Sequence, residues 1–162
     1  AGLRAGLVGT VMIDDGIELA PAEMTTPPAI ELSRTLSVMV EAGCKAAFME
    51  VSSHSLIQHR VGGLRFAGAA FTNLTQDHLD YHRTFDDYRL AKLKLFSDLL
   101  PAGAPAVINA DSDEREAFEA AARQAGLPVF TFGWKGDHLW FDEISPKATG
   151  QDLTVQWEEA PG

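Results

Sequence analysis

Polar residues crowd the end of an apolar segment near residue 50. The segment ends in Met49-Glu50-Val51-Ser52-Ser53-His54-Ser55, where Glu50 follows a run of apolar residues. A carboxylate on an otherwise apolar strand is costly unless it is paired or bound to a metal ion. Glu50 is therefore a candidate ligand for Mg²⁺, which prefers a few carboxylates together with phosphate and water oxygens. The alternative is a strand end in contact with solvent.

A second polar run follows the apolar residues near position 71. It reads Thr72-Asn73-Leu74-Thr75-Gln76-Asp77-His78-Leu79-Asp80-Tyr81-His82, with two Asp and two His at positions 77–82. This composition suits a metal site of His and carboxylate ligands, although the spacing matches no established zinc pattern. A structural role for two His residues in a polar loop is the competing interpretation.

Lys92 combines a reactive amine with an apolar setting. On a helix, its neighbours one turn away would be Tyr88, Leu95 and Phe96. Such a lysine either extends its amine to solvent or is desolvated, which lowers its pKa. A neutral amine is a nucleophile that can form a Schiff base, act as a base, or add CO₂ to give a carbamate. Lys94 differs, because Asp98 lies four residues on and can pair with it.

Two further polar groups lie where we expect elements to begin or end. Arg60, in Gln58-His59-Arg60, suits bidentate contact with a phosphate or carboxylate. Thr25 and Thr26 would add hydroxyl donors at the start of a helix, where anions are favoured. Solvated loops remain the alternative for both groups.

The elements that must position these residues alternate along the chain. We expect strands at 6–12, 46–51, 66–73, 106–109 and 129–132. Helices are expected from Pro27 to Gly43, with Thr26 as cap, from a cap at Thr84 to about Leu100, and from a cap at Asp111 to about Gly126. Residues 14–28 are expected to form a long loop. Segments 138–144 and 153–157 are expected to form an antiparallel pair around Lys147-Ala148-Thr149-Gly150.

This order predicts an α/β fold: a mostly parallel sheet flanked by helices, with a small antiparallel β appendage at the end. Apolar runs without alternation favour strands covered on both faces. The chain has 162 residues, a formal net charge of −10 and one cysteine. These values argue against a generally basic nucleic-acid binder, exclude an intrachain disulfide and favour a reducing compartment. No run reaches the roughly 18 apolar residues typical of a membrane span.

Several motifs then match a family when taken in order. They are Thr25-Thr26-Pro27, Met49-Glu50-Val51-Ser52-Ser53-His54, Gln58-His59-Arg60-Val61, the run from Thr72 to His82, Tyr88-Arg89-Leu90-Ala91-Lys92 and Ile108-Asn109-Ala110-Asp111. Together they resemble the central domain of the Mur ligases. The likeness is greatest to the branch that adds the third stem-peptide residue to UDP-N-acetylmuramoyl-L-alanyl-D-glutamate in peptidoglycan synthesis. It covers about residues 6–149.

The resemblance implies an ATP-dependent cytoplasmic ligase that uses Mg²⁺ and joins a carboxylate to diaminopimelate or lysine through an acyl phosphate. Carried over by position, Thr25, Thr26, Ser52, Gln58 and Arg60 would contact the UDP-muramoyl substrate. Glu50, His78 and a carbamylated Lys92 would form the metal and catalytic centre, and Asn109 would contact adenine. Under this resemblance, the carbamate interpretation of Lys92 overtakes the solvent-reaching one.

The resemblance also implies what lies outside this sequence. The family's phosphate loop and its N- and C-terminal domains are missing from residues 1–162, so we expect a partial central domain that is inactive alone. The chain begins at Ala1 without Met, which agrees with a fragment. The alternatives are a sister ligase, such as a folylpolyglutamate or cyanophycin synthetase, and a non-catalytic α/β binding module. The identity of the third amino acid stays open.

Overall fold

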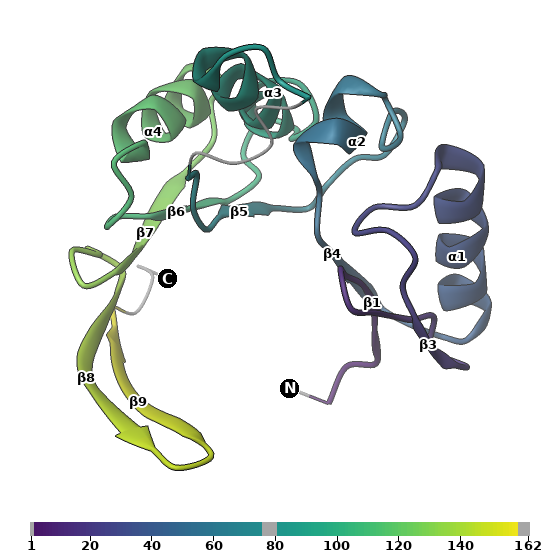
Figure 1. Ribbon diagram of the computed structural model, residues 1–162, viewed down its shortest axis with the longest axis horizontal. Coiled ribbons are helices and arrows are strands. Elements are labelled where there is room, and N and C mark those ends of the chain that lie inside the picture. The colour runs from purple at the N-terminus through teal and green to yellow at the C-terminus, as the bar shows by residue number, and fades with distance from the viewer. Residues whose placement is uncertain (1, 76–80, 159–162) are drawn as a thin grey trace. The chain divides into compact units, whose positions relative to one another are not determined.

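The computed structural model describes residues 2–75 and 81–158, and the chain divides into two compact units, Ala1–Leu64 and Arg65–Gly162 (Figure 1). Both units combine helices with a sheet, and parallel pairs dominate the larger sheet. The predicted α/β class with a parallel-rich sheet flanked by helices is confirmed. Within the described ranges, no helix is long and apolar enough to cross a membrane.

The first unit is a four-stranded sheet with one long helix beside it (Figure 1). Its elements are β1 (Ala5–Val8), β2 (Met12–Asp14), β3 (Leu19–Pro21), α1 (Ala29–Glu41), β4 (Ala46–Met49) and α2 (Ser53–Ile57). The strand order is β3-β2-β1-β4, in which only the β1–β4 pair is parallel. Because β1 and β4 are parallel, the residues that follow Val8 and Met49 emerge at the same edge of the sheet.

The predicted strand at 6–12 is in fact the first part of a hairpin. The chain turns after β1, where the Gly9 amide donates to the Met12 carbonyl oxygen at 3.0 Å, and returns as β2. The predicted loop at 14–28 was also wrong in part, because β3 lies within it and pairs with β2. The Asp15 carboxylate closes this second turn by accepting from the amides of Glu18 and Ile17, and these hydrogen bonds lower the pKa of Asp15.

Helix α1 packs on the sheet through its apolar face. Leu32 and Met39 are buried, whereas Val40 is 73% exposed, and the Met39 side chain lies against Gly6 of β1 so closely that a Cβ there would clash. The helix starts later than predicted. Pro28 occupies the N-cap position without a side-chain bond, and the Thr26 hydroxyl bonds elsewhere.

One expectation about the strands of this unit was wrong. Leu7 of β1 and Phe48 of β4 are partners in the parallel register, yet they are 39% and 65% exposed. The apolar runs therefore do not mean that both faces of this sheet are covered. Alternation of burial along β1, from buried Gly6 and Val8 to exposed Leu7, is typical of a sheet with one covered face.

The second unit is a five-stranded sheet with the order β5-β6-β7-β8-β9. Its elements are β5 (Ala69–Phe71), α3 (Phe85–Ser97), β6 (Ala106–Asn109), α4 (Arg115–Gln124), β7 (Val129–Gly133), β8 (Leu139–Lys147) and β9 (Gly150–Trp157). The first four strands are parallel, and β9 returns antiparallel to β8 through the predicted turn. Figure 1 shows α3 and α4 side by side over the same face of β5–β7.

Stacked aromatic rings fill the core between these helices and the sheet. Phe118 of α4 stacks on Phe71 of β5 with ring centroids 3.7 Å apart, and it meets Phe96 of α3 edge-on at 5.5 Å. Phe118 is fully buried, so it joins both helices to the sheet. The Thr84 hydroxyl caps α3 as predicted by accepting from the Asp87 amide at 3.0 Å.

The predicted cap of α4 was wrong. Glu114, not Asp111, occupies the N-cap position, and its side chain makes no cap bond. The Asp111 carboxylate instead accepts from the amides of Trp134 and Lys135, at 2.6 and 3.0 Å, in the turn after β7. Two charge-assisted bonds to a neighbouring strand end outweigh one local capping bond.

Candidate functional site

Glu50 follows β4 directly, and one residue holds its carboxylate. Thr10 donates twice, from its amide to Oε1 at 3.1 Å and from its hydroxyl to Oε2 at 2.6 Å. The Thr10 hydroxyl also lies 3.1 Å from the hydroxyl of Thr25. Glu50 itself is exposed, so the carboxylate is oriented from one side and open on the other.

Sequence reasoning missed Thr10. The residue lies in the turn between β1 and β2, which was taken as the middle of one strand. The available signal was the pair Gly9-Thr10 directly after an apolar run, since side chains that follow a parallel strand face the same edge as those after its neighbour. Recognising the parallel pairing of β1 with β4 would have brought Thr10 beside Glu50.

Thr26 lies in the segment that leads into α1, and its hydroxyl is hydrogen-bonded to the segment after β4. Its hydroxyl donates to the Glu50 carbonyl oxygen at 2.9 Å and accepts from the Ser52 amide at 3.1 Å. Ser52 in turn caps α2, because its hydroxyl accepts from the Ser55 amide at 3.2 Å. Thr26 is 1% exposed, so its hydroxyl acts inside the protein. A substrate contact by Thr26 stays a prediction.

Arg60 extends this network from the other side. Its Nη1 donates to the Thr26 carbonyl oxygen at 2.8 Å, and its Nε donates to Oε1 of Gln58 at 2.8 Å. No residue in 2–75 or 81–158 accepts from Nη2, which leaves that edge of the guanidinium for a ligand. His59 between them has φ 54°, a left-handed conformation that lets the side chains on either side meet.

The structure thus joins all six residues that the sequence singled out in this unit. Through Thr10 and the backbone of residues 26 and 50, hydrogen bonds link Thr25, Thr26, Glu50, Ser52, Gln58 and Arg60. We call these six residues and Thr10 the Glu50 network. It combines hydroxyls, an amide, a guanidinium and one carboxylate, the groups that recognise a polar anionic ligand and hold a cation beside it.

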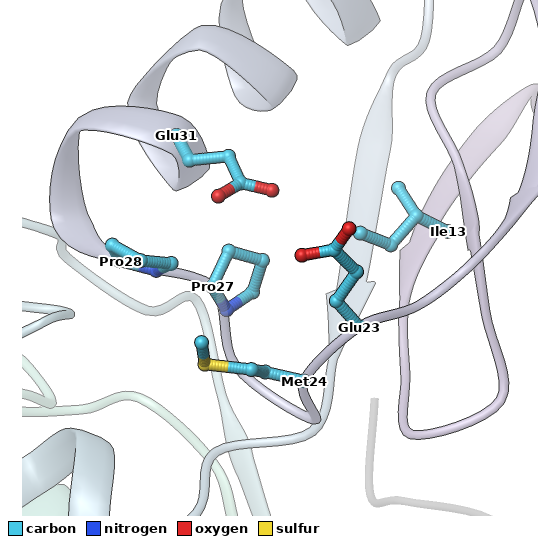
Figure 2. Close-up of a pocket in the computed structure, with 6 residues that line it drawn as sticks. All are labelled: Ile13, Glu23, Met24, Pro27, Pro28 and Glu31. Atoms are coloured by element: carbon cyan, nitrogen blue, oxygen red, sulfur yellow. The ribbon is translucent and has the colours of Figure 1, made fainter.

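A shallow pocket lies next to this network in the same unit. It is lined by Ile13, Glu23, Met24, Pro27, Pro28 and Glu31. Figure 2 shows the carboxylates of Glu23 and Glu31 pointing into it from opposite sides. Two carboxylates over an apolar floor repel a phosphate or carboxylate, so this pocket does not suit an anionic substrate. Met24 connects it to the network, since its sulfur lies 3.3 Å from Nη1 of Arg60.

Lys92 lies on α3 in the second unit, in the apolar setting that the sequence predicted. Its Nζ lies 5.4 Å from the centroid of the buried Tyr88 ring. Burial disfavours the charged ammonium and lowers the pKa of Lys92 below its usual range. Tyr88 is backed by His82, which is also buried and stacks on it at 4.9 Å. The amine is therefore desolvated rather than extended into solvent.

The expected partner of Lys94 was wrong. Within the described part of the chain, no ion pair joins Lys94 to Asp98. The Asp98 carboxylate instead accepts from the neighbouring Ser97 hydroxyl at 2.6 Å. This short local bond replaces the predicted pair across one helical turn.

Asn109 ends β6, and backbone groups engage its side chain. Nδ2 donates to the Thr72 carbonyl oxygen at 2.7 Å, and Oδ1 accepts from the Asp111 amide at 2.9 Å. Gly133 of β7 passes so close that a Cβ there would collide with the Asp111 carboxylate and crowd Oδ1 of Asn109. Asn109 thus ties the ends of β5 and β6 together, and its contact with adenine stays a prediction.

The candidate metal ligands fall in different parts of the chain. His78 lies outside the described residues. Among residues 2–75 and 81–158, no three His, Cys, Asp or Glu side chains gather as a metal site. Glu50 by itself still fits Mg²⁺, which takes one or two protein carboxylates and completes its shell with water and phosphate oxygens.

Comparison with known proteins places these residues in a family. The model of the Mur ligase middle domain matches residues 2–161. A UDP-N-acetylmuramoyl-L-alanyl-D-glutamate–2,6-diaminopimelate ligase of Caulobacter vibrioides is 42% identical over 156 residues, which cover 94% of this chain and 32% of that protein. The Bacteroides fragilis protein of the same name is 53% identical over 112 residues, covering 68% of this chain and 22% of its own length.

Solved structures agree with this assignment. The structure of a UDP-N-acetylmuramoyl-L-alanyl-D-glutamate–2,6-diaminopimelate ligase matches with a TM-score of 0.77 and 27% identity, over 94% of this chain and 31% of the other. A structure titled FPGS-AMPPCP complex has the same fold, with a TM-score of 0.64, 15% identity, and 98% and 45% of the two chains covered. With the family model spanning nearly every residue, the chain belongs to the Mur ligase middle domain family.

Proposed function

We propose that this chain is part of a cytoplasmic ligase of peptidoglycan synthesis that extends UDP-N-acetylmuramoyl-L-alanyl-D-glutamate by one amino acid, with both units in one central domain. Relatives named for that reaction support the proposal, and the chain spans 32% of the length of the first of them. Their names include 2,6-diaminopimelate, so we propose diaminopimelate as the incoming amino acid.

The proposed reaction has two steps. A carboxylate oxygen of the terminal D-glutamate attacks the γ-phosphorus of ATP, the bond to the β-phosphate oxygen breaks, and an acyl phosphate and ADP form. The amine of diaminopimelate then attacks the acyl carbon and loses a proton, and inorganic phosphate leaves as the amide forms. Both steps gather negative charge at one place, so they need cations and directed hydrogen-bond donors.

The Glu50 network is the observation that carries the proposal. Within it, Arg60 and Gln58 fix one another, and Nη2, which has no acceptor among residues 2–75 and 81–158, offers charged donors to a phosphate or carboxylate of the substrate. Thr25 offers a hydroxyl beside them. Thr26 and Ser52 hold the loops that carry these groups, and we propose that both also contact the UDP-muramoyl substrate.

We propose that Glu50 is a ligand of Mg²⁺, with His78 as a second protein ligand. When bound, Mg²⁺ supplies positive charge that stabilises the transferring phosphoryl group. Thr10 fixes the Glu50 carboxylate through both of its oxygens, and Glu50 is exposed. For the base of ATP, we propose Asn109, whose side chain is already oriented by the backbone at residues 72 and 111.

We propose that Lys92 carries a carbamate. Its desolvated amine in the neutral form attacks CO₂, a C–N bond forms, and one proton is released to solvent. The product is an anion that becomes a further oxygen ligand for a cation. The apolar packing of Lys92 over Tyr88 supports this assignment, because burial favours the neutral amine that must react.

The test uses the full-length ligase that carries this chain. ATP, Mg²⁺ and UDP-N-acetylmuramoyl-L-alanyl-D-glutamate are supplied with diaminopimelate, L-lysine or no amino acid, and phosphate release and the amide product are measured. A folate with L-glutamate is assayed in parallel for the sister ligases. Product with diaminopimelate alone supports the proposal. Product only with folate contradicts it and favours a folylpolyglutamate synthetase, and no product with any pair favours a binding module.

A further inference from the structure

We propose that Thr10 is a positioning residue that holds the Glu50 carboxylate in the orientation in which it binds a divalent cation and links it to Thr25. This inference rests on the proposed role of Glu50 as a metal ligand. It concerns a residue to which neither the motifs nor the family resemblance assigned a role.

The first support is that one residue engages both carboxylate oxygens. The Thr10 amide donates to Oε1 at 3.1 Å and its hydroxyl to Oε2 at 2.6 Å. Two donors from the backbone and the side chain of one residue fix the carboxylate plane as well as its position. A metal ligand that is oriented by partners of this kind loses less freedom on binding, and removing such partners commonly costs 10- to 100-fold in affinity.

The second support is that the sheet fixes the distance between the two residues. Val8 and Met49 are partners in the parallel β1–β4 ladder, and the Glu50 amide donates to the Val8 carbonyl oxygen at 2.8 Å. Thr10 lies two residues beyond Val8, in the turn that Gly9 opens. A side chain at Gly9 would press on the Glu50 carboxylate, since its Cβ would lie 3.0 Å from Oε1. The backbone therefore holds both partners in place before any ligand arrives.

The third support is the direction of the hydrogen bonds. A threonine hydroxyl has one proton, and that of Thr10 is given to the charged Glu50 oxygen at 2.6 Å. The Thr10 hydroxyl also lies 3.1 Å from the Thr25 hydroxyl, so it stands between Thr25 and the Glu50 carboxylate. Thr10 thus links the Thr25 hydroxyl to the Glu50 carboxylate. The chain Thr25–Thr10–Glu50 connects a proposed substrate contact with a proposed metal ligand.

A purely structural role for the Thr10 hydroxyl predicts something different. Thr10 is exposed, so its methyl and hydroxyl fill no core space. If the hydroxyl only stabilised the turn, Thr10→Val would change the free energy of unfolding and leave metal affinity alone. If it positions Glu50, metal affinity falls while the fold persists.

The experiment measures Mn²⁺ dissociation constants by electron paramagnetic resonance of free Mn²⁺ in the full-length ligase. The variants are Thr10→Val, Thr10→Ser, Glu50→Gln and the control Thr35→Val, which removes a hydroxyl bonded only within α1, to the Glu31 carbonyl oxygen. We expect Thr10→Val to weaken Mn²⁺ binding about tenfold. Thr10→Ser, which keeps both donors, and Thr35→Val should bind as the wild type does.

A double variant tests the link to Thr25. Because Thr25 acts through Thr10, Thr25→Val should add no further loss of Mn²⁺ affinity in the Thr10→Val background. Wild-type affinity in Thr10→Val, together with a loss in Glu50→Gln, overturns the inference and leaves the metal role of Glu50 standing. Unchanged affinity in Glu50→Gln overturns that metal role, and the positioning role of Thr10 with it. Thermal unfolding of each variant, with Thr10→Ser as the rescue, separates these results from misfolding.

Discussion

Nη1 of Arg60 donates to the carbonyl oxygen of Thr26 at 2.8 Å and joins two loops that lie 34 residues apart in the sequence. The guanidinium makes this bond while its Nε holds Gln58 at 2.8 Å. Only a planar group with donors on several edges can serve both partners and still face a ligand. Arg60 therefore joins Gln58 and Thr26 within the Glu50 network and keeps Nη2 available for a ligand.

Replacing Arg60 by lysine tests that double role. An ammonium cannot at once reproduce the bond to Gln58, the bond to Thr26 and the contact of Nη2 with an anion. In the full-length ligase, Arg60→Lys should raise KM for the UDP-muramoyl substrate about 10- to 100-fold, which corresponds to ~1.5–3 kcal/mol. The KM for ATP should change little. Steady-state kinetics with each substrate varied in turn gives both constants.

Arg34→Lys on α1 is the matched control, because Arg34 is exposed and lies outside the Glu50 network. It should leave both constants unchanged. An equal rise of both KM values in Arg60→Lys would remove Arg60 from the substrate site.

Local sequence signals predicted most helices and strands. The predicted helix caps were wrong where the side chain bonds to a residue far away in the sequence. The strand at 106–109 and the β8–β9 turn were predicted correctly, because Pro105, the apolar runs and Gly150 act locally. Thr26 and Asp111 both have the residue type of a helix cap, yet one bonds to Glu50 and the other to the turn after β7. Capping chemistry is local, whereas these partners are brought near only by the folded sheet.

The candidate site shows the same division. Motif order predicted six residues of the Glu50 network, because each carries a side chain suited to ligand contact. Thr10 was missed because the Gly9-Thr10 pair after the apolar run points to Glu50 only once the parallel pairing of β1 with β4 is recognised. Only the parallel register of β1 and β4 brings it beside Glu50.

The core of the second unit should depend strongly on Phe118. This side chain is fully buried between Phe71 and Phe96, and its removal leaves a cavity under both helices. Phe118→Ala should lower the free energy of unfolding by about 3–5 kcal/mol, measured by urea denaturation. Leu90→Ala on α3, where the side chain is 57% exposed, should stay within about 0.5 kcal/mol of the wild type. Equal losses for both variants would contradict this packing.

The lowered pKa of Lys92 gives a pH dependence with a definite sign. The unfolded chain binds a proton at Lys92 up to its ordinary pKa of 10.5, whereas the folded chain releases it at a lower pH because burial disfavours the ammonium. The unfolded state thus binds more protons between these two values, so stability contributed through Lys92 rises with pH there and is lost as pH falls through the folded pKa.

The comparison is wild type against Lys92→Met, by urea denaturation at several pH values in CO₂-free buffer, where the amine stays free. We expect the wild type to gain stability relative to Lys92→Met as the pH rises toward 10.5. A difference that stays constant, or that shrinks with rising pH, would show that the amine is not desolvated.

Lys92 and Lys94 lie on the same helix and should differ sharply in function. The Lys92 amine is desolvated above the Tyr88 ring, which favours the neutral form that adds CO₂. In the full-length ligase, Lys92→Ala should therefore abolish turnover, because no carbamate can form, while Lys94→Ala should retain most of it.

Acetate or formate should partly restore the turnover of Lys92→Ala by supplying a carboxylate where the carbamate would lie. The two variants are assayed side by side for phosphate release, with and without these small acids. Turnover of Lys92→Ala near the wild-type rate would show that the lysine serves only in packing against Tyr88.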